Sequence, residues 1–365
     1  MPHHLLFRTK LRALLSALIL AAPCACSWGG SYHASSIPVT PPARLCRQGV
    51  AATCRSVESV EATMGEPAMR ILEATGTPGG AQDVRVLTLA LGSGQSYTVF
   101  RAKWRSLGSG DIINEPRKEL AAYAVQKLVL EPADYVVPPT AGHCFDIEEY
   151  RALVDARAAP TFAGCDCVFG FLSYWLGDVM DLKTAREQGI LSTSEGPLGG
   201  AGLFDAGLFH SDPFYRRSVA NLNVVTFLIH HADSHAGQFL LTEPPIHVYS
   251  VDNSIAFESI KNPLLLVRDD WSRLEVPAIP RDVAEGLTQL EPDALRALHT
   301  IERYELGSGV LERRPATPDD LEAHDGVEWT RGVLRIGLTR REVDGVDARI
   351  AELARRLVHA ELGVF

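Results

Sequence analysis

The segment from residue 231 to residue 253 constrains the fold of this chain more than any other stretch of its sequence. It opens with the polar run His231-Ala232-Asp233-Ser234-His235-Ala236-Gly237-Gln238. Two short β-prone runs follow, residues 239–241 and 246–251, around a Glu-Pro-Pro turn at 243–245. Because such a hairpin brings the chain back on itself, Asp252 at the end of the second run is expected to converge with Asp233 on one crevice.

The spacing of these polar residues indicates a particular chemistry. Gln238 lies five positions after Asp233, and Asp252 lies nineteen positions after it. Phosphoryl transfer needs an acid that orients or deprotonates the attacking hydroxyl, together with oxygen ligands for a divalent metal. In protein kinases the catalytic-loop Asp likewise precedes a metal-binding Asn by five positions, and a second metal-binding Asp follows. Asp233 is therefore the candidate catalytic acid, and Gln238 and Asp252 are the candidate metal ligands.

Length and charge narrow the class of protein. The chain has 365 residues, of which 46% are hydrophobic and 22% charged, enough for one large or two modest globular domains. Its formal net charge is −10, and no cluster of Lys and Arg forms a basic stripe. The electrostatic footprint of a general nucleic-acid binder is missing, so nucleic acid is not expected as a partner.

The N-terminus predicts export. Arg8, Lys10 and Arg12 precede an apolar run over residues 13–22 and then two cysteines, the layout of a signal peptide spanning residues 1–26. The apolar run is too short to cross a bilayer. A lipoprotein-type signal, with a lipid that would tether the protein to a membrane, stays open as an alternative. Residues 27–75 are expected to form a flexible tether and N-terminal extension of a protein that is secreted or lies in the cell envelope.

Five cysteines lie beyond the signal region: Cys46, Cys54, Cys144, Cys165 and Cys167. In an exported protein two disulfides are expected, Cys46 with Cys54 and Cys144 with either Cys165 or Cys167. Connectivity does not follow from the sequence, so that choice stays open. Structural zinc is the rival interpretation, but the spacing of Cys165 and Cys167 matches neither a zinc ribbon nor a zinc finger.

A β-hairpin is predicted early in the folded part. Residues 84–91 are β-branched and aliphatic, Gly92-Ser93-Gly94 favours a turn, and residues 97–104 alternate between two faces. Since side chains alternate along a strand, Arg101 and Lys103 share one face. The turn at Gly92 and Gly94 could let backbone N–H groups approach phosphates, or it could be a plain hairpin turn.

The remaining pattern alternates between helices and strands. Residues 119–130 predict a helix, 135–140 a strand ended by prolines, 168–176 an apolar strand and 219–229 a buried helix that leads into the polar loop. Beyond Pro263 the pattern is helical. The last helix is expected to begin at the capping box Thr339-x-x-Glu342.

Taken in order, these parts carry a family resemblance. The most similar pieces are residues 119–123, Val137-Pro138-Pro139-Thr140, Asp233-Ser234-His235 with Gln238, and Val251-Asp252-Asn253 with Phe257. Over residues 84–260 the chain resembles the atypical kinase-like proteins that include the secreted Golgi casein kinase family and, more distantly, the phosphoinositide kinases. The resemblance implies an α+β, two-lobed protein-kinase-like fold. A small sheet-plus-helix N-lobe would span residues 76–177, and a mainly helical C-lobe would span residues 178–365.

The resemblance also implies roles on the nucleotide side of the crevice. A strand Lys contacts the nucleotide phosphates in such proteins and is held by a helix Glu. Lys103 and Glu119 match these positions, with Arg101 and Glu115 as competing candidates. The implied cofactors are ATP and Mg²⁺ or Mn²⁺.

On the catalytic side, Asp233 matches the catalytic acid and His235 matches a histidine that lies beside the transferred phosphate. Asp252 matches the main metal ligand. Gln238 departs from the Asn or Glu usual at its position, although an amide oxygen is still a hard ligand for Mg²⁺ or Mn²⁺. The implied reaction is phosphoryl transfer to a hydroxyl of a protein, lipid or sugar, which the sequence does not distinguish.

Two other classes of function are compatible with these residues. A pseudokinase would keep the fold and the nucleotide crevice without catalysis, and Gln238 and export away from cytoplasmic ATP favour it. A metal-dependent hydrolase would use His231, Asp233 and His235 around zinc. Their spacing matches neither H-x-H-x-D-H nor H-E-x-x-H, and adjacent histidines rarely converge on one ion.

Overall fold

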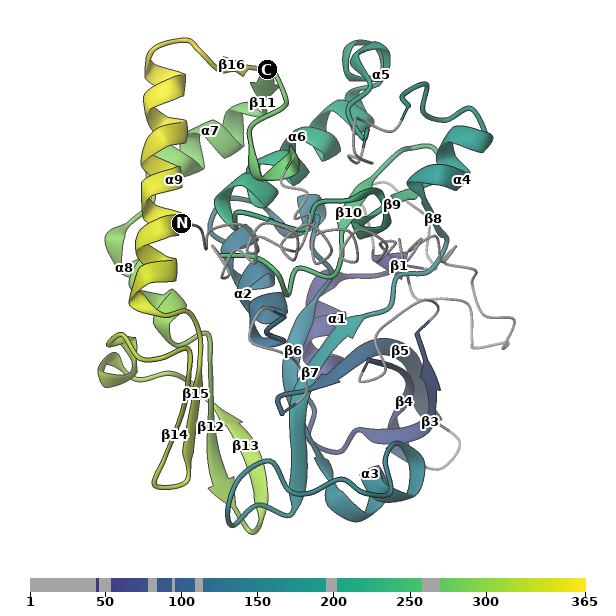
Figure 1. Ribbon diagram of the computed structural model, residues 1–365, viewed down its shortest axis with the longest axis vertical. Coiled ribbons are helices and arrows are strands. Elements are labelled where there is room, and N and C mark those ends of the chain that lie inside the picture. Colours follow the sequence, from purple (N-terminus) through teal and green to yellow (C-terminus); the bar gives the residue numbers. More distant parts are fainter. Residues whose placement is uncertain are drawn as a thin grey trace, which may run out of the picture.

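The computed structural model describes residues 44–45, 54–77, 84–93, 96–108, 114–194, 202–257 and 270–365. The predicted fold class is confirmed: a sheet-plus-helix lobe is followed by a larger lobe rich in helices (Figure 1). The expected signal peptide and part of the expected tether at residues 27–75 lie outside the described residues. The later part of that segment is folded, because Val57–Met64 form a helix and a strand begins at Arg70. Among the helices within them, none has the length and apolar character that crossing a bilayer requires.

The first lobe is built on a five-stranded antiparallel sheet in the order β3-β4-β5-β7-β6. Its strands are β3 (Arg70–Gly76), β4 (Arg85–Ser93), β5 (Ser96–Ser106), β6 (Thr140–Asp146) and β7 (Cys167–Tyr174). Three helices accompany it: α1 (Val57–Met64), α2 (Arg117–Gln126) and α3 (Ile147–Leu153), with the 3-10 turn η1 (Pro132–Asp134) after α2. A short parallel pair, β1 (Arg44–Leu45) and β2 (Cys54–Arg55), precedes α1.

The predicted hairpin is present as β4 and β5, whose ladder closes at Ser93 and Ser96. On β5 the alternation works as expected, because Phe100, Ala102 and Trp104 are buried in the core of the lobe. Trp104 donates its indole N–H to the Tyr150 hydroxyl at 3.0 Å and packs edge-on against Phe145. This packing fixes the orientation of β5 and turns the side chains of odd-numbered residues, Lys103 among them, to the opposite face.

The second lobe holds helices around a small sheet. Its helices are α4 (Leu182–Glu187), α5 (Ala206–Ser211), α6 (Pro213–Leu228), α7 (Arg281–Thr288), α8 (Pro292–Arg296) and α9 (Arg340–Val358). The small sheet runs β10-β9-β8, with β8 (Val179–Asp181), β9 (Phe239–Thr242) and β10 (Val248–Ser250). A two-stranded parallel pair, β11 (Ala278–Ile279) and β16 (Gly363–Val364), and the 3-10 turns η3 (Ala236–Gln238) and η4 (Asp270–Ser272) complete this part.

Helix α6 and the hairpin after it match the sequence prediction. Asp212 caps α6 by accepting the backbone N–H groups of Phe214 and Tyr215, and Pro213 stands in its first turn. From Ser218 to Leu228 every residue of the helix is buried, so α6 is the central element of the largest core cluster. Strands β9 and β10 pair antiparallel directly after the polar loop, as the two β-prone runs indicated.

Three local predictions were wrong. The strand expected at residues 135–140 begins only at Thr140, because Pro138 and Pro139 cannot donate to a ladder. The helix expected at 119–130 begins two residues earlier and ends at Gln126. The region beyond Pro263 is not helical throughout, because residues 302–336 form a four-stranded antiparallel sheet in the order β13-β12-β15-β14.

This C-terminal sheet consists of β12 (Glu302–Gly307), β13 (Val310–Arg314), β14 (Val327–Thr330) and β15 (Val333–Ile336), with the 3-10 turns η5 (Ala297–His299) and η6 (Pro318–Leu321) beside it. Its strands alternate apolar and charged residues, a period-two signal interrupted by tight turns. Tyr304, Leu334 and Ile336 pack against Phe169 and Phe171 of β7. The C-terminal sheet therefore covers the face of the first sheet on which these two phenylalanines lie.

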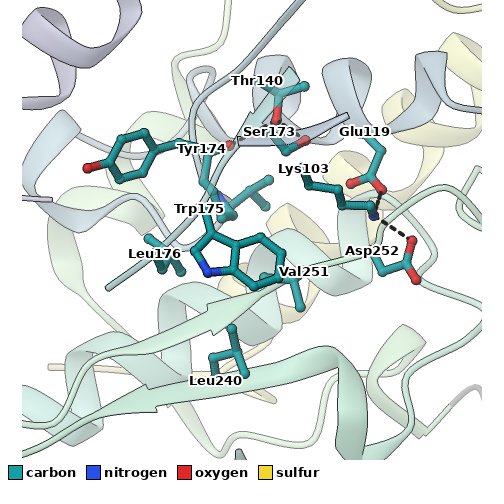
Figure 2. A pocket seen from close by; sticks show the side chains of 12 residues that line it. Lys103, Glu119, Thr140, Ser173, Tyr174, Trp175, Leu176, Leu240, Val251 and Asp252 are labelled. Carbon is teal, nitrogen blue, oxygen red and sulfur yellow. Dashed lines mark hydrogen bonds and ion pairs between the residues drawn. The ribbon is translucent and has the colours of Figure 1, made fainter. Parts of the chain in front are cut away.

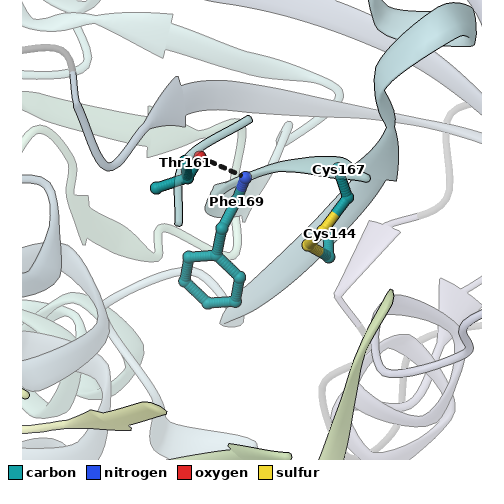
Figure 3. The surroundings of a disulfide bond; sticks show 4 residues. All are labelled: Cys144, Thr161, Cys167 and Phe169. Carbon is teal, nitrogen blue, oxygen red and sulfur yellow. Dashed lines mark hydrogen bonds between the residues drawn. A yellow bond between two sulfur atoms is a disulfide. The ribbon is translucent and has the colours of Figure 1, made fainter. Parts of the chain in front are cut away.

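Cys144 and Cys167 form a disulfide that ties β6 to β7 (Figure 3). Of the two partners left open for Cys144, the structure therefore selects Cys167, and Cys165 is a free, buried thiol. Cys46 and the side chain of Cys54 lie outside the described residues, so their pairing stays a prediction. The bridge joins neighbouring strands 23 residues apart in sequence, at the side of the sheet that the C-terminal sheet covers.

Candidate active site

The site is organised around Lys103, which projects from β5 toward two carboxylates. Its Nζ lies 2.6 Å from Glu119 Oε1 on α2 and 2.8 Å from Asp252 Oδ1 in the second lobe (Figure 2). Only 15% of the Lys103 side chain is exposed. Burial lowers the pKa of Lys103, but the two carboxylates outweigh burial and leave that pKa above its ordinary value. The ammonium group is therefore charged and links the two lobes.

Both carboxylate oxygens of Glu119 accept hydrogen bonds, one of them from Lys103. It stands in the first turn of α2 and its second oxygen, Oε2, accepts the backbone N–H of Asn253 at 3.1 Å. Burial raises the pKa of Glu119, and the positive charge of Lys103 opposes that shift. The carboxylate thus joins a strand of the first lobe to the segment that follows Asp252.

Asp252 occupies an unusual backbone conformation, with φ +59°. Left-handed φ values are uncommon outside glycine, although Asp tolerates them, and they cluster at functional sites. Its Oδ1 accepts both the Lys103 ammonium and the Ser254 hydroxyl, the latter at 3.1 Å, whereas Oδ2 makes no hydrogen bond to any described residue. Burial raises the pKa of Asp252, but Lys103 outweighs it and the pKa falls well below its usual range. A charged carboxylate with one unused oxygen, 39% exposed, faces the crevice.

The polar loop before β9 brings three of the predicted side chains together. Gln238 Nε2 donates to Asp233 Oδ2 at 3.2 Å, and the same nitrogen lies 3.1 Å from His235 Nε2. The amide oxygen of Gln238 makes no hydrogen bond within the described chain. Asp233, His235 and Gln238 therefore form one cluster at the start of η3, as the spacing of the sequence predicted.

The tautomer of His235 follows from its neighbours. Its Nδ1 accepts the backbone N–H of Gly237 at 3.0 Å, so the neutral ring carries its proton on Nε2. The Gln238 amide nitrogen itself carries protons, so it cannot accept the Nε2 proton of His235. That proton is therefore available to another acceptor. The Asp233 carboxylate lies 3.8 Å from it, beyond hydrogen-bond distance. A ligand oxygen entering the cluster would find a donor there.

Backbone hydrogen bonds hold this loop beside the Asp252 segment. The N–H of Val251 donates to the carbonyl of Gln238 at 2.9 Å, and the N–H of Ala232 donates to the carbonyl of Ile255 at 3.1 Å. These two bonds bracket the site, one before Asp252 and one after it. The hairpin of β9 and β10 thus returns the chain to the polar loop. Of the two acids expected to converge on one crevice, however, only Asp252 lines the crevice beside Lys103, and Asp233, His235 and Gln238 are not among its lining residues.

A crevice lies beside the Lys103 cluster. Its polar lining is Lys103, Glu119, Asp252 and the hydroxyl-bearing Thr140, Ser173 and Tyr174, and its apolar lining is Val137, Pro138, Trp175, Leu176, Leu240 and Val251 (Figure 2). Its free volume is about 40 Å³, well below the roughly 300–1,000 Å³ of ligand pockets. The direct contact between Lys103 and Asp252 closes one end, so a large ligand has to part these two side chains.

The competing candidates lie elsewhere. The Arg101 guanidinium stacks over the Trp175 ring at 5.3 Å from its centroid, and burial lowers its pKa. Glu115 pairs with Arg117 and Lys118 rather than with the strand cation. Gly92 has φ +106° within the last part of β4, opposite Tyr97, and Gly94 lies outside the described residues. The structure thus brings Lys103 together with Glu119, whereas Arg101 and Glu115 contact other residues.

Ser173 had no legible signal in the sequence, and Thr140 and Asn253 stood in recognised pieces without a role of their own. Ser173 and Thr140 share a hydroxyl-to-hydroxyl contact of 3.0 Å in the crevice wall, and Ser173 stands opposite Lys103 in the pairing of β5 with β7. Only the strand register, which a single sequence does not give, would have placed it there. Asn253 was part of the recognised motif, but its backbone contact to Glu119 depends on the docking of two lobes.

The donor set suits Mg²⁺ or Mn²⁺ better than zinc. In the described parts of the chain, no group of three or more His, Cys, Asp or Glu side chains is placed to hold a metal ion. The ring of His231 is fully buried, makes no hydrogen bond to described residues and has a pKa lowered to about 4 by burial. The zinc site that His231, Asp233 and His235 were to form is thus not found. Mg²⁺ is commonly held by one or two protein oxygens plus phosphates and water, which Asp252 and Gln238 fit.

Comparisons with known proteins give a likeness of fold. No protein-family model matches the sequence, and no curated protein matches it significantly. Two crystal structures of the Golgi casein kinase, one with Mn and ADP bound, align with a TM-score of 0.47 and 11% sequence identity. The alignment covers 84% of this chain and 77% and 78% of theirs. A likeness of this size concerns the course of the chain and carries no statement about activity.

Proposed function

We propose that this protein is a phosphotransferase that moves a phosphoryl group from ATP to a hydroxyl group. One observation carries the proposal: a buried lysine from the sheet lobe meets a helix carboxylate and, from the other lobe, an aspartate with an unused oxygen. This arrangement puts a positive charge and a metal-type ligand at the same end of one crevice. Enzymes of this class work mainly by positioning and by electrostatic stabilisation of the phosphates.

Each residue has a role that its surroundings support. Lys103, oriented by Glu119, would contact nucleotide phosphates once its bond to Asp252 is exchanged. Asp252 through its unused oxygen and Gln238 through its amide oxygen would hold the divalent metal, which when bound neutralises phosphate charge. Asp233 would orient the acceptor hydroxyl and accept its proton. His235, with its Nε2 proton available, would donate to an oxygen of the transferred group.

The crevice wall supports a nucleotide base as occupant. Trp175, Leu240 and Val251 offer an aromatic face and aliphatic contacts next to the charged end. The Thr140 and Ser173 hydroxyls also line the crevice and contact each other. Apolar surface for the base and a charged end for the phosphates are the two parts that a nucleotide site requires.

Export forms part of the proposal. The Cys144–Cys167 disulfide joins two strands of the first lobe, and disulfides of this kind persist in oxidising compartments. We therefore place the reaction in the cell envelope or outside the cell, on a protein, lipid or sugar hydroxyl. A nucleotide-binding pseudokinase is the second candidate, because Gln238 replaces a charged or Asn ligand and so weakens metal binding.

The deciding experiment measures binding and transfer in the full-length protein. Thermal unfolding is followed with ATP and Mn²⁺ or Mg²⁺ for the wild type and for Asp252→Asn, which keeps the shape and tolerates the left-handed φ. The proposal predicts a metal-dependent rise in Tm for the wild type that is largely lost in the variant. Labelled γ-phosphate is then followed into products.

Asp293→Asn is the matched control, since Asp293 is an exposed carboxylate on α8. It should behave as the wild type. A metal-dependent shift without any labelled product would favour the pseudokinase. No shift with nucleotide and either metal, or a shift that Asp252→Asn leaves intact, would refute both nucleotide functions.

A further inference from the structure

A second cavity lies behind α2, on the far side of Thr140 from the crevice. Its volume is about 210 Å³, and Thr140 is the residue that both cavities share. Four parts of the fold surround it: α1, α2, the start of β6 and the β12–β13 hairpin of the C-terminal sheet (Figure 1). None of the roles proposed above uses this space.

One face of α2 forms a wall of this cavity. Leu120, Tyr123, Ala124 and Lys127 line it, at the three-to-four spacing that puts residues on one side of a helix. Glu119 precedes Leu120 and points into the crevice instead. The same helix therefore borders both cavities with neighbouring faces.

The charges in the cavity wall cancel. Lys127 of α2 is ion-paired with Glu61 of α1, and Arg313 of β13 is ion-paired with Glu302 at 3.0 Å. Glu302 is 1% exposed and also accepts the Gly142 N–H and the Tyr304 hydroxyl, so it anchors Arg313. Two cations and two carboxylates leave no net charge, so the wall favours neither an anion nor a cation.

Unused hydrogen-bonding capacity remains on these groups. Glu61 Oε1 accepts both the Lys127 ammonium and the Tyr123 hydroxyl, the latter at 2.5 Å, while its Oε2 makes no hydrogen bond to described residues. Arg313 pairs with Glu302 through Nη2, and its Nη1 and Nε have no hydrogen-bond partner among described residues. Side-chain exposures of 33% for Glu61, 39% for Lys127 and 47% for Arg313 leave all three within reach of a ligand.

From these observations we propose that the cavity behind α2 binds a neutral, hydroxyl-rich small molecule of the chemical class of monosaccharides and cyclitols. A hydroxyl group both donates and accepts, so vicinal hydroxyls can satisfy Glu61 Oε2 and the Arg313 N–H groups together. Met64, Leu120 and Ile301 supply apolar contacts for the C–H faces of a ring. An anion would instead have to displace Glu61 from Lys127 or Glu302 from Arg313.

The test is saturation-transfer NMR on the full-length protein with four probes: glucose, galactose, xylose and myo-inositol. Three forms of the protein are compared: wild type, Ala124→Leu and Glu61→Gln. Leu at position 124 fills the cavity without removing a polar group, and Gln at 61 keeps the shape while removing the charged acceptor. We expect transfer to at least one probe in the wild type, none with Ala124→Leu, and binding about tenfold weaker with Glu61→Gln.

Competition separates the chemical classes. Inorganic phosphate and citrate should leave the transfer signal unchanged, because the wall has no net charge to attract them. Absence of transfer from all four probes, equal transfer in the wild type and in Ala124→Leu, or displacement of the probe by phosphate or citrate would each overturn the proposal. Unchanged Tm and circular dichroism of the variants exclude misfolding as the cause of lost binding, and the readout is independent of ATP.

Discussion

At the scale of single residues, the site depends on one cation shared between two acids. Lys103 is within 2.8 Å of both Glu119 and Asp252, and each acid is held by a further contact to the segment 252–254. The left-handed backbone of Asp252 turns its carboxylate toward the opposite lobe. Such strained, charged constellations are costly to fold, and they persist where chemistry requires them.

Substitution of the two strand cations distinguishes their roles. With the proposed function, Lys103→Met should lower phosphoryl-transfer activity by about 100-fold or more, because the proposed electrostatic contact to the phosphates is lost. Arg101→Met should cost only a few-fold, since a partly exposed cation–π contact is worth about 0.5–1 kcal/mol. Radiolabel transfer and ATP-induced Tm shifts measure both variants. The reverse order would assign the phosphate contact to Arg101.

At the scale of elements, the sequence predicted what local pattern determines. The β4–β5 hairpin, the buried helix α6, the β9–β10 hairpin and the capping box of α9 follow from alternation, periodicity and capping chemistry. The placement of Asp233, His235 and Gln238 in one cluster also followed from spacing within one loop. These features depend on residues close together in the chain.

Features that depend on distant pairing were missed. The pattern beyond Pro263 predicts helix where the C-terminal sheet lies, because the short strands of that sheet are rich in Glu and Arg, which are good helix formers. Nine of the ten residues of α2 are buried, so its amphipathic pattern is nearly absent. The contact of Ser173 with Thr140 and of Asn253 with Glu119 required strand register and lobe docking.

The disulfide between β6 and β7 should stabilise the first lobe. Closing a loop of 23 residues contributes about 3 kcal/mol in the chain-entropy estimate. The double variant Cys144→Ala/Cys167→Ala should therefore unfold at lower urea concentration than the wild type, and reductant should destabilise it by about 3 kcal/mol less than it destabilises the wild type. Cys165→Ala, which removes a buried thiol and no bridge, is the control and should remain sensitive to reductant. Equal sensitivity of the double variant and the wild type would contradict a structural role.

At the scale of the whole molecule, α2 joins both lobes and the C-terminal part. Arg117 in its first turn makes a bidentate pair with Glu342 of α9, both bonds at 2.9 Å, and also donates to the Gly337 carbonyl. The Glu115 N–H donates to the Ser254 carbonyl, two residues after Asp252. Since Glu119 stands on the same turn, the position of the Lys103 partner depends on contacts more than 200 residues away in sequence.

Loss of the Glu342 charge should destabilise the protein in a pH-dependent way. Burial raises the pKa of Glu342, but the Arg117 hydrogen bonds outweigh it and hold that pKa below its ordinary value of 4.5. A depressed folded-state pKa gives stability that is present above pH 4.5 and lost as pH falls through the folded value.

Glu342→Gln keeps the capping contact to Thr339 and should cost about 3 kcal/mol at pH 7, as expected for breaking a buried pair. The difference from the wild type should shrink below pH 4.5. Urea unfolding across pH measures it. Asp347→Asn removes an exposed carboxylate of the same helix that forms no ion pair with described residues, and it should change little at any pH. An equal loss of stability in both variants would show that the Arg117 pair does not explain the effect of Glu342→Gln.

Substitution of two glycines tests whether the contact of Arg117 with α9 also positions Glu119 in the proposed nucleotide site. Gly326 has φ +85° and a Cβ there would lie 2.7 Å from the Arg117 guanidinium carbon, whereas Gly332 has φ +79° and only a 3.5 Å contact to Leu306. Both Ala substitutions carry similar backbone strain of about 1 kcal/mol, so they differ chiefly in the displacement of Arg117.

Gly326→Ala should therefore reduce the Tm rise induced by ATP and Mn²⁺, because a shifted α2 moves Glu119 from Lys103. Gly332→Ala should lower the basal Tm and leave the ATP-induced rise intact. Equal ligand-induced rises in the two variants would show that Glu119 is positioned by the crevice alone, independently of α9.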